Sequence, residues 1–281
     1  MSFSPSPDQQ ELIPAVELPA TLLPFSLANV KQAVADASLA VDDTDWLFFT
    51  NFDISCLNAV ESLNLPVRIH AEPGLLILKM ITKVHEAMHG TIMAYILGNL
   101  WSMGLLPAIH FTVFGSADYP HRLNQQSTKQ ADSSIGPAVN NGWPAMIVEA
   151  GWSEGLGHLH RDASWWLTSE VPPNDPKVVI LVTFLRRSRT FKLERYELRT
   201  ATTVPTRTAP APAGRRDVPT LIEAVTINLR TTPPTVTGAP LTIPFNGIMR
   251  RAPTPGQEHN ITLDAAYLAD WALSIATQNN L

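Results

Sequence analysis

The segment His85-Glu86-Ala87-Met88-His89 contains the residue types that bind a metal ion and activate water. In a helix, residues i and i+4 lie on the same face, so both imidazoles point the same way with the glutamate beside them. Two histidine ligands and a glutamate base are the chemistry of zinc hydrolases. No further motif marks a third protein ligand, and a helix that carries two histidines by chance is the alternative interpretation.

Two carboxylates, Asp132 and Glu149, form a second candidate centre. Asp132 lies in the polar segment KQADSS, and Glu149 ends the apolar run Pro144–Glu149. Hard divalent cations prefer oxygen ligands, and two carboxylates that converge from neighbouring strands make a typical magnesium site. Mg²⁺ or Mn²⁺ held there can generate hydroxide and neutralise charge on a phosphate. Aspartates in polar loops are common, so Glu149 is the more informative of the two.

The predicted elements around these residues alternate between strands and helices, which indicates an α/β fold. Apolar runs predict strands at Leu75–Met80, Pro107–Phe114, Pro144–Glu149 and Val178–Leu185. Helical spacing of apolar residues predicts one helix from Lys83 to about Met103 and another that Ser153 caps. The imperfect alternation of Phe191–Leu198 indicates an edge strand or a bulge.

The chain is expected to form a disordered tail at residues 1–20 and a single domain at residues 21–281. Threonine, proline and alanine dominate near residues 200–220, which predicts a long exposed loop. Beyond this loop the strands and helix expected in Thr220–Leu281 are too few for a separate core. We therefore expect this C-terminal extension to pack back on the preceding region.

Composition limits the classes of partner. A chain of 281 residues that is 45% hydrophobic can bury a sizeable core. Its net charge is −5 and only 16% of its residues are charged, so no overall basic field attracts nucleic acid. This composition weighs against strong non-specific binding to DNA or RNA.

Several features favour an intracellular protein, cytoplasmic or nuclear. The single cysteine, Cys56, excludes an intramolecular disulfide, and the absence of lysine or arginine before Lys31 disfavours a secretory signal. The uncharged stretch Gly90–Ile109 is long enough for a membrane span, but its glycines and Pro107 favour a buried helix followed by a strand. Membrane attachment is therefore not expected. No glycine loop that would hold phosphates follows a strand, so no nucleotide cofactor is expected.

The order of these segments resembles the fungal PD-(D/E)XK nuclease-like family and, more distantly, the Uma-type endonuclease-like proteins of bacteria. The resemblance covers about residues 65–200 and rests on LLILK before His85-Glu86, KQADSS, WPAMIVEAGWSEGLGHLHRDASWWL and KVVILVTFL. It implies a restriction-endonuclease-like core, an α+β mixed sheet flanked by helices. It also implies that Asp132 occupies the Pro-Asp position, that Glu149 is the acid of (D/E)XK, and that Glu86 completes the metal site.

Glycine, Gly151, stands where the lysine of that motif belongs. The family lysine orients the attacking water and offsets negative charge during phosphoryl transfer, and a glycine can do neither. A neighbouring element can supply a cation instead, and Lys129 is the preferred candidate. The other candidates are Arg161, His158 and His160, whereas Asp162 is expected to have a structural role.

Aromatic and basic residues near these acids suggest contacts with a substrate. Trp152 follows Glu149 and is the preferred group to stack on a base or an aromatic ligand, whereas Trp166 falls on the apolar helix face. Arg161 and His158 are further candidates for substrate binding. The basic segment at residues 186–192 either holds phosphates or forms a solvated hairpin turn.

Three functions remain open at this level. The first is a Mg²⁺- or Mn²⁺-dependent phosphodiester hydrolase with Asp132, Glu149 and Glu86 as metal ligands and with Lys129 and His85 as further catalytic residues. The second is a repurposed fold that binds a partner, or transforms a small organic molecule by acid–base chemistry at Glu149, Glu86 and His85. The third is a zinc hydrolase built on the two histidines. The partner is accordingly a nucleic acid or a small organic ligand.

Overall fold

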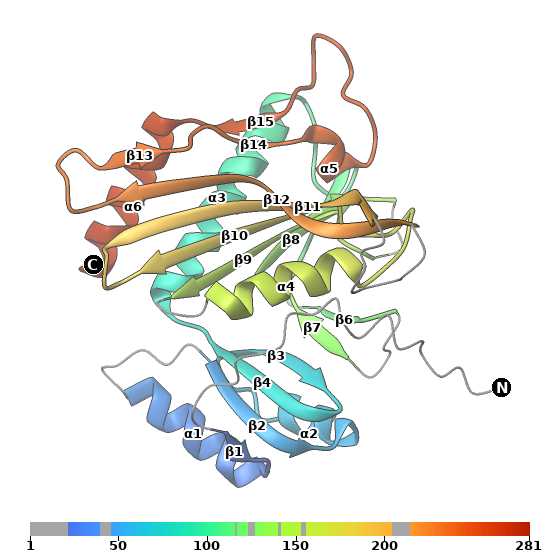
Figure 1. Cartoon of the computed structure of the whole chain (residues 1–281), viewed down its shortest axis with the longest axis vertical. Coiled ribbons are helices and arrows are strands. Elements are labelled where there is room, and N and C mark those ends of the chain that lie inside the picture. The colour runs from blue at the N-terminus through green and yellow to red at the C-terminus, as the bar shows by residue number, and fades with distance from the viewer. Residues whose placement is uncertain are drawn as a thin grey trace.

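A computed structural model describes residues 22–39, 46–115, 117–122, 127–139, 142–152, 156–203 and 214–281. Within these ranges the chain forms six α-helices, two large mixed sheets and a small two-stranded sheet (Figure 1). The mixed α/β class expected from the sequence is therefore confirmed. The expected tail at residues 1–20 and the expected helix cap at Ser153 lie outside the described residues.

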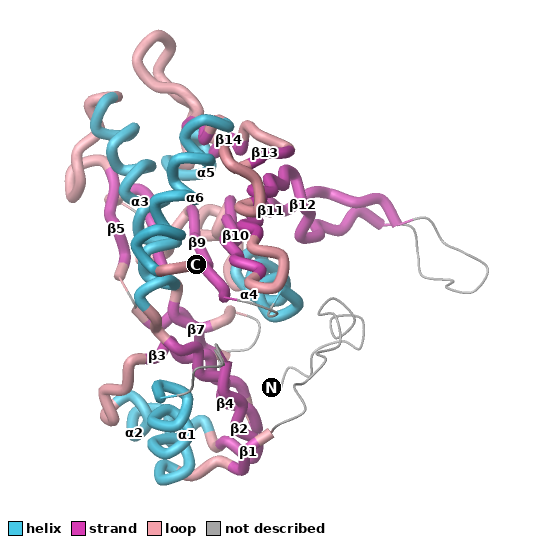
Figure 2. Tube along the Cα trace, turned by 90° about the vertical axis from the view of Figure 1, so that its left-hand side faces the viewer, coloured by secondary structure: helices cyan, strands magenta, loops and turns pink. Residues whose placement is uncertain are grey.

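The six-stranded sheet has the strand order β1-β2-β4-β3-β7-β6. Its strands are β1 (Leu23–Pro24), β2 (Trp46–Phe52), β3 (Val67–Glu72), β4 (Gly74–Met80), β6 (Asp118–Pro120) and β7 (Thr128–Gln130). Helices α1 (Leu27–Leu39) and α2 (Leu57–Glu61) cover one face (Figure 2), and a short 3₁₀ turn, η2 (Ile54–Cys56), precedes α2. Val30 of α1 and Val60 of α2 pack there in one apolar core with Leu76 of β4.

The seven-stranded sheet has the order β13-β12-β11-β10-β9-β8-β5. Its strands are β5 (Phe111–Phe114), β8 (Ser133–Pro137), β9 (Met146–Trp152), β10 (Val178–Leu185), β11 (Thr190–Thr203), β12 (Gly214–Asn228) and β13 (Thr235–Thr237). Strands β9 and β10 are parallel, with helix α4 (Leu156–Thr168) connecting them. A helix in the connection is what a parallel pair requires, because the chain must return to the same end of the sheet.

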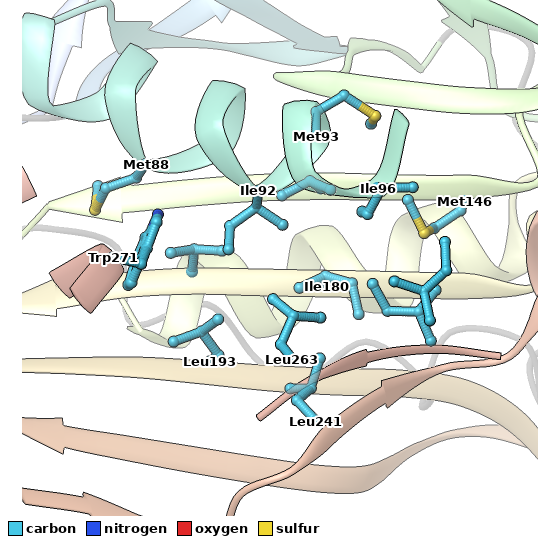
Figure 3. Close-up of a cluster of buried hydrophobic side chains, with 14 of the residues drawn as sticks. Met88, Ile92, Met93, Ile96, Met146, Ile180, Leu193, Leu241, Leu263 and Trp271 are labelled. Carbon is cyan, nitrogen blue, oxygen red and sulfur yellow. The ribbon is translucent and has the colours of Figure 1, made fainter. Parts of the chain in front are cut away.

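Helices cover both faces of the seven-stranded sheet. Helices α3 (Lys83–Ser102) and α6 (Ala265–Asn279) enclose the larger core, in which Met88 and Ile92 of α3 approach Ile180 of β10 and Trp271 of α6 (Figure 3). Helix α4 packs on the opposite face. None of the described helices combines the length and the apolar character that crossing a bilayer requires.

The C-terminal region contributes directly to the larger core. Strands β14 (Leu241–Ile243) and β15 (Ile261–Leu263) pair as a small sheet, and helix α5 (Phe245–Met249) lies between them in sequence. Residues of β14, α5, β15 and α6 join the buried apolar cluster that also contains α3 and β9. Much of the core therefore forms between segments that are far apart in the sequence.

Two expectations about the strands need correction. Only Phe111–Phe114 of the expected strand Pro107–Phe114 is a strand, because the chain turns at Ala108, whose φ is 61°. The segment Phe191–Leu198 lies inside β11 and pairs with β10 and β12, so it is not an edge. The expected irregularity is a register shift between Arg195 and Tyr196 in the pairing with β12, where the extra residue is Ile222 of β12.

Part of the expected loop near residues 200–220 is strand. Residues 200–203 belong to β11 and residues 214–220 to β12, and the two segments pair with each other. The threonines that suggested a loop also favour extended backbone, and the cross-strand pairing decides in favour of the strand. Residues 204–213 lie outside the described residues.

Candidate functional site

Asp132 and Glu149 meet at the buried ammonium group of Lys79. The Nζ atom of Lys79 donates a hydrogen bond to Oδ2 of Asp132 and another, 3.0 Å long, to Oε2 of Glu149. The side chains of Lys79, Asp132 and Glu149 are 4%, 0% and 1% exposed. The two predicted acids thus meet around Lys79, which was not among the predicted site residues.

Backbone pairing positions each member of this group. Lys79 is the penultimate residue of β4 in the six-stranded sheet, and Glu149 lies in β9 of the seven-stranded sheet. Asp132 lies where the chain passes from β7 to β8. Its Oδ2 accepts a 2.8 Å hydrogen bond from the backbone N–H of Ala150, which fixes the carboxylate against β9. The site therefore lies at the junction of the two large sheets.

A second lysine, Lys129, adjoins the same centre. Its Nζ forms an ion pair with Asp162 of α4 and lies 3.9 Å from Oε1 of Glu149. That oxygen of Glu149 also accepts a 2.7 Å hydrogen bond from Nε1 of Trp166. Lys129 therefore lies beside the centre, but its shorter contact is with Asp162.

Burial and nearby charges shift the pKa values of Asp132 and Glu149 in opposite directions. Burial opposes ionisation of Asp132, but the positive charges of His85 and Lys79 lower its pKa well below the usual value. Burial raises the pKa of Glu149 to about 7, although the nearby Lys129 and Lys79 act in the opposite direction. Burial disfavours the charged form of Lys79, but the negative charges of Asp132 and Glu149 raise its pKa. A carboxyl group that titrates near neutral pH is suited to proton transfer.

His85, Glu86 and His89 form a cluster that can hold a metal ion. The Oε1 atom of Glu86 lies 3.5 Å from Nδ1 of His85 and 3.2 Å from Nε2 of His89. His85 also contacts the acid centre, since its Nε2 lies 3.0 Å from Oδ2 of Asp132. The structure therefore places Glu86 with the histidines rather than against Glu149.

Arg68 of β3 connects the histidine cluster to the acid centre. Its Nη2 donates a 3.4 Å hydrogen bond to Oε1 of Glu86, and its Nε lies 3.8 Å from Oδ1 of Asp132. The side chain of Arg68 is 18% exposed and that of Glu86 is 43% exposed. This side of the site is consequently the part that solvent reaches.

The remaining predicted site residues lie away from the acid pair. Trp152 is buried on the opposite face of β9 from Glu149, where its ring packs 5.2 Å from that of Phe184. His158 packs against the ring of Phe48, with 4.9 Å between centroids, and burial lowers its pKa. A stacking role for Trp152 beside Glu149 does not agree with this placement.

Arg161 and His160, both on α4, also point elsewhere. Arg161 lines a separate cavity of about 110 Å³ together with His70, Trp165 and other residues. The Nε2 atom of His160 lies 2.9 Å from Oε2 of Glu194 in β11. Neither of these contacts involves Glu149.

Close packing of α4 on β9 accounts for the glycine at position 151. A Cβ atom on Gly151 would lie 2.5 Å from Cδ1 of Leu159, far inside van der Waals contact. Residues 149 and 151 point to the same face of β9 because side chains alternate along a strand. A lysine at position 151 would therefore meet the helix before it could reach solvent or substrate.

Lys79 has a signal in the sequence that points to a buried ion pair. It is the one charged residue in the apolar run Leu75–Met80. Lysine is almost never fully buried without a partner, so a lysine inside a buried strand calls for a carboxylate nearby. The partners Asp132 and Glu149 are 53 and 70 residues away in the sequence, and only the tertiary structure identifies them.

The cavity that touches Glu149 is small. A cavity of about 10 Å³ touches Lys79, Lys129 and Glu149, together with Trp46 and Arg68. That volume is close to the least that a single water molecule needs.

Searches against protein-family models and against curated protein sequences find no match for this chain.

Proposed function

We propose that the protein is a divalent-metal-dependent phosphodiester hydrolase of the PD-(D/E)XK type in which Lys79 replaces the lysine missing at Gly151. The observation that supports this proposal is the pair of hydrogen bonds from Nζ of Lys79 to Asp132 and Glu149. An acid from a loop, an acid from a strand and a lysine beside both are the residue types that the resemblance implies. Here the lysine comes from β4 instead of β9.

The donor atoms of the acid pair are suited to Mg²⁺ or Mn²⁺. Oδ1 of Asp132 is buried and has no hydrogen-bond partner among the described residues, and Lys79 contacts both Asp132 and Glu149, so the two carboxylates lie beside one cation. Hard divalent cations bind such oxygens, so Asp132 and Glu149 would hold the ion. When bound, the ion would supply an acidified water and neutralise charge on the phosphate.

The protein side chains have separate roles in this proposal. Lys79 orients the attacking water and offsets the negative charge that develops on the phosphate. Glu149, whose pKa burial raises to about 7, exchanges a proton near neutral pH. Arg68, on the more exposed side of the centre, contacts a non-bridging phosphate oxygen. His85 positions Asp132 through the contact at 3.0 Å.

Burial of the centre favours a second candidate, acid–base chemistry on a small molecule in a repurposed fold. The side chains of Asp132 and Glu149 are at most 1% exposed, and the adjoining cavity is only about 10 Å³. A polynucleotide needs an open groove, whereas a small ligand needs only a local displacement of side chains. This candidate uses Glu149 as the proton carrier and needs no metal.

Cleavage assays with two classes of substrate test the hydrolase proposal. Single- and double-stranded nucleic acids and the small diester bis(p-nitrophenyl) phosphate are incubated with the protein and Mg²⁺ or Mn²⁺. Asp132→Asn, Glu149→Gln and Lys79→Met should each reduce metal-dependent cleavage by about 100-fold or more, since each removes a group that acts on the reacting atoms. The matched controls Asp36→Asn and Lys83→Met, at exposed positions, should retain it.

The pattern of activity distinguishes the two candidates. Metal-dependent cleavage that Lys79→Met abolishes would support the hydrolase. Absence of cleavage of every substrate with either metal would contradict it and leave the acid–base candidate. Cleavage that survives Asp132→Asn would show that the activity arises at another site or from a contaminant.

A further inference from the structure

The start of helix α3 fixes two histidines one turn apart, beside the passage from β7 to β8. Oγ1 of Thr82 accepts a 3.2 Å hydrogen bond from the backbone N–H of His85 and so caps the helix. His85 and His89 follow on the buried side, with ring centroids 5.0 Å apart. Their side chains are only 3% and 5% exposed. Helix geometry therefore presents two imidazoles to one point.

One nitrogen of each ring is held by a partner on another element. Nε2 of His85 lies 3.0 Å from Oδ2 of Asp132, and Nδ1 of His89 lies 2.8 Å from Oγ of Ser133. When these nitrogens carry the protons, the other nitrogen of each ring has a free lone pair. Histidines that bind metals are oriented in this way, with the non-ligating N–H donated to a carboxylate or another acceptor.

The opposite nitrogens, Nδ1 of His85 and Nε2 of His89, have no hydrogen-bond partner among the described residues although both are buried. Both approach the same oxygen, Oε1 of Glu86, at 3.5 and 3.2 Å. The three potential ligand atoms lie within 4.8 Å of one another. Two ring nitrogens and one carboxylate oxygen therefore converge on one place, as the protein ligands of a zinc-class ion do.

We propose that His85, Glu86 and His89 bind a zinc-class divalent cation, through Nδ1, Oε1 and Nε2 respectively. Two imidazoles and one carboxylate match the ligands of catalytic zinc sites, which keep a fourth position for water. Glu86 is the most exposed of the three residues, so solvent reaches this part of the cluster. Mg²⁺ is disfavoured because it selects oxygen ligands, whereas imidazole favours the later transition metals.

This site adjoins the one that the proposed hydrolase function uses, and the two share the contact between His85 and Asp132. It requires neither Glu149 nor Lys79, and Asp132 contributes only by holding His85. When the cation is bound, Glu86 interacts with both the cation and Arg68. The guanidinium of Arg68 also has Asp132 as a partner, because its Nε lies 3.8 Å from Oδ1 of Asp132. Zinc binding can therefore be measured without any substrate and independently of phosphodiester cleavage.

Zinc retention by the full-length chain tests the proposal. Protein freed of metal by a chelator is mixed with excess ZnCl₂, passed through gel filtration and analysed for metal by mass spectrometry. The wild type should retain one equivalent of zinc, and Glu86→Gln and His89→Ala should lose it. Ser133→Ala should weaken binding about 10- to 100-fold in a calorimetric titration, because the partner that orients His89 is removed.

Two controls separate this result from non-specific binding and from the acid pair. His259→Ala removes a histidine that is exposed and far along the chain, and it should retain zinc as the wild type does. Glu149→Gln should also retain zinc although it should lose phosphodiesterase activity. Co²⁺ in place of zinc should give visible absorption bands of a four- or five-coordinate site, and Glu86→Gln should abolish them.

Several results would overturn the assignment. These are a wild type that retains no zinc, or a folded Glu86→Gln or Ser133→Ala variant that binds zinc as tightly as the wild type. Glu86 is partly exposed and Ser133→Ala removes only a hydroxyl, so both variants should fold even where His89→Ala does not. The zinc assignment would also be contradicted if the purified protein contained iron that zinc could not displace.

Discussion

Lys79 is a buried cation whose charge is balanced by two acids from other elements. Taking an ammonium group out of water is costly, and only close carboxylates with good geometry recover that cost. Nζ of Lys79 has both Asp132 and Glu149 as partners, so removal of the lysine leaves two buried carboxylates close together. The same residue thus supports the fold and, in our proposal, the chemistry.

Lys79→Met should lower the free energy of unfolding by about 3–5 kcal/mol, because it leaves buried charges without their partner. Urea denaturation at pH 8 and without metal measures this change. Lys83→Met, at an exposed position on α3, should change stability by less than about 0.5 kcal/mol. A Lys79→Met variant as stable as the wild type would show that the acids are compensated in another way.

Glu149 should make the stability of the metal-free protein depend on pH. Its pKa is raised from the ordinary value of 4.5 to about 7, chiefly by burial, so the folded state binds the proton more tightly than the unfolded chain. Its contribution to stability is present below about pH 4.5 and is lost as the pH rises to about 7. Asp132, whose pKa is lowered, acts in the opposite sense and only at pH values below its usual range.

The measurement compares urea denaturation of the wild type and Glu149→Gln between about pH 4.5 and 8 in the presence of a chelator. The stability of the wild type relative to the variant should decrease across the interval from 4.5 to about 7. A difference that stays constant, or that increases with pH, would mean that Glu149 is ionised throughout.

Strand β9 and helix α4 form the element pair that determines what the site can contain. Along β9, Val148 and Trp152 face the core that α3 covers, whereas Ile147 faces α4. Glu149 also lies on the α4 side and is held there by Nε1 of Trp166. The next position on this side is Gly151, where Leu159 of α4 leaves no room for a side chain, and the cation that contacts Glu149 is Lys79 of β4.

Gly151→Ala should destabilise the protein by about 1–3 kcal/mol, because the added Cβ would lie 2.5 Å from Cδ1 of Leu159 and displace this buried side chain from its packed position. Thermal and urea denaturation measure the change. Gly157→Ala in α4 is the matched control, since a Cβ added there would meet no neighbouring atom within 4 Å and alanine favours a helix. Equal stability of the two variants would contradict the packing argument.

At the scale of the whole molecule, the candidate centre is an interface between the two large sheets. The six-stranded sheet contributes the cations Arg68, Lys79 and Lys129. The seven-stranded sheet and its helix α4 contribute Glu149 and Asp162, and Asp132 lies at the passage from one sheet to the other. Charge complementarity across this junction therefore links docking of the sheets to assembly of the site.

Trp271→Ala should destabilise the entire protein by about 3–5 kcal/mol, as expected for a large aromatic residue removed from a core. Trp271 is 5% exposed, packs against Phe191 at 4.9 Å and donates a 2.7 Å hydrogen bond to Oγ1 of Thr91. The unfolding midpoints followed by fluorescence and by far-ultraviolet circular dichroism should shift together. Leu273→Ala, on the exposed side of the same helix, should have little effect.

A different outcome would change the description of the C-terminal region. If Trp271→Ala melted α6 alone and left the remaining transition unchanged, the C-terminal region would not share a cooperative core with α3 and β10. Its membership of the same apolar cluster favours one transition for both.

The sequence by itself determined the mixed α/β class, the main helix of the site and the two acids, because apolar periodicity and local charge placement are short-range signals. It also marked His85, Glu86 and His89, since i and i+4 spacing is a property of one helix. The tertiary structure decided that Lys79 lies between Asp132 and Glu149, that Trp152 faces away from them, and that α4 excludes a side chain at Gly151. Those outcomes depend on contacts between segments that are tens of residues apart. The periodicity of one segment does not specify which distant segment packs against it.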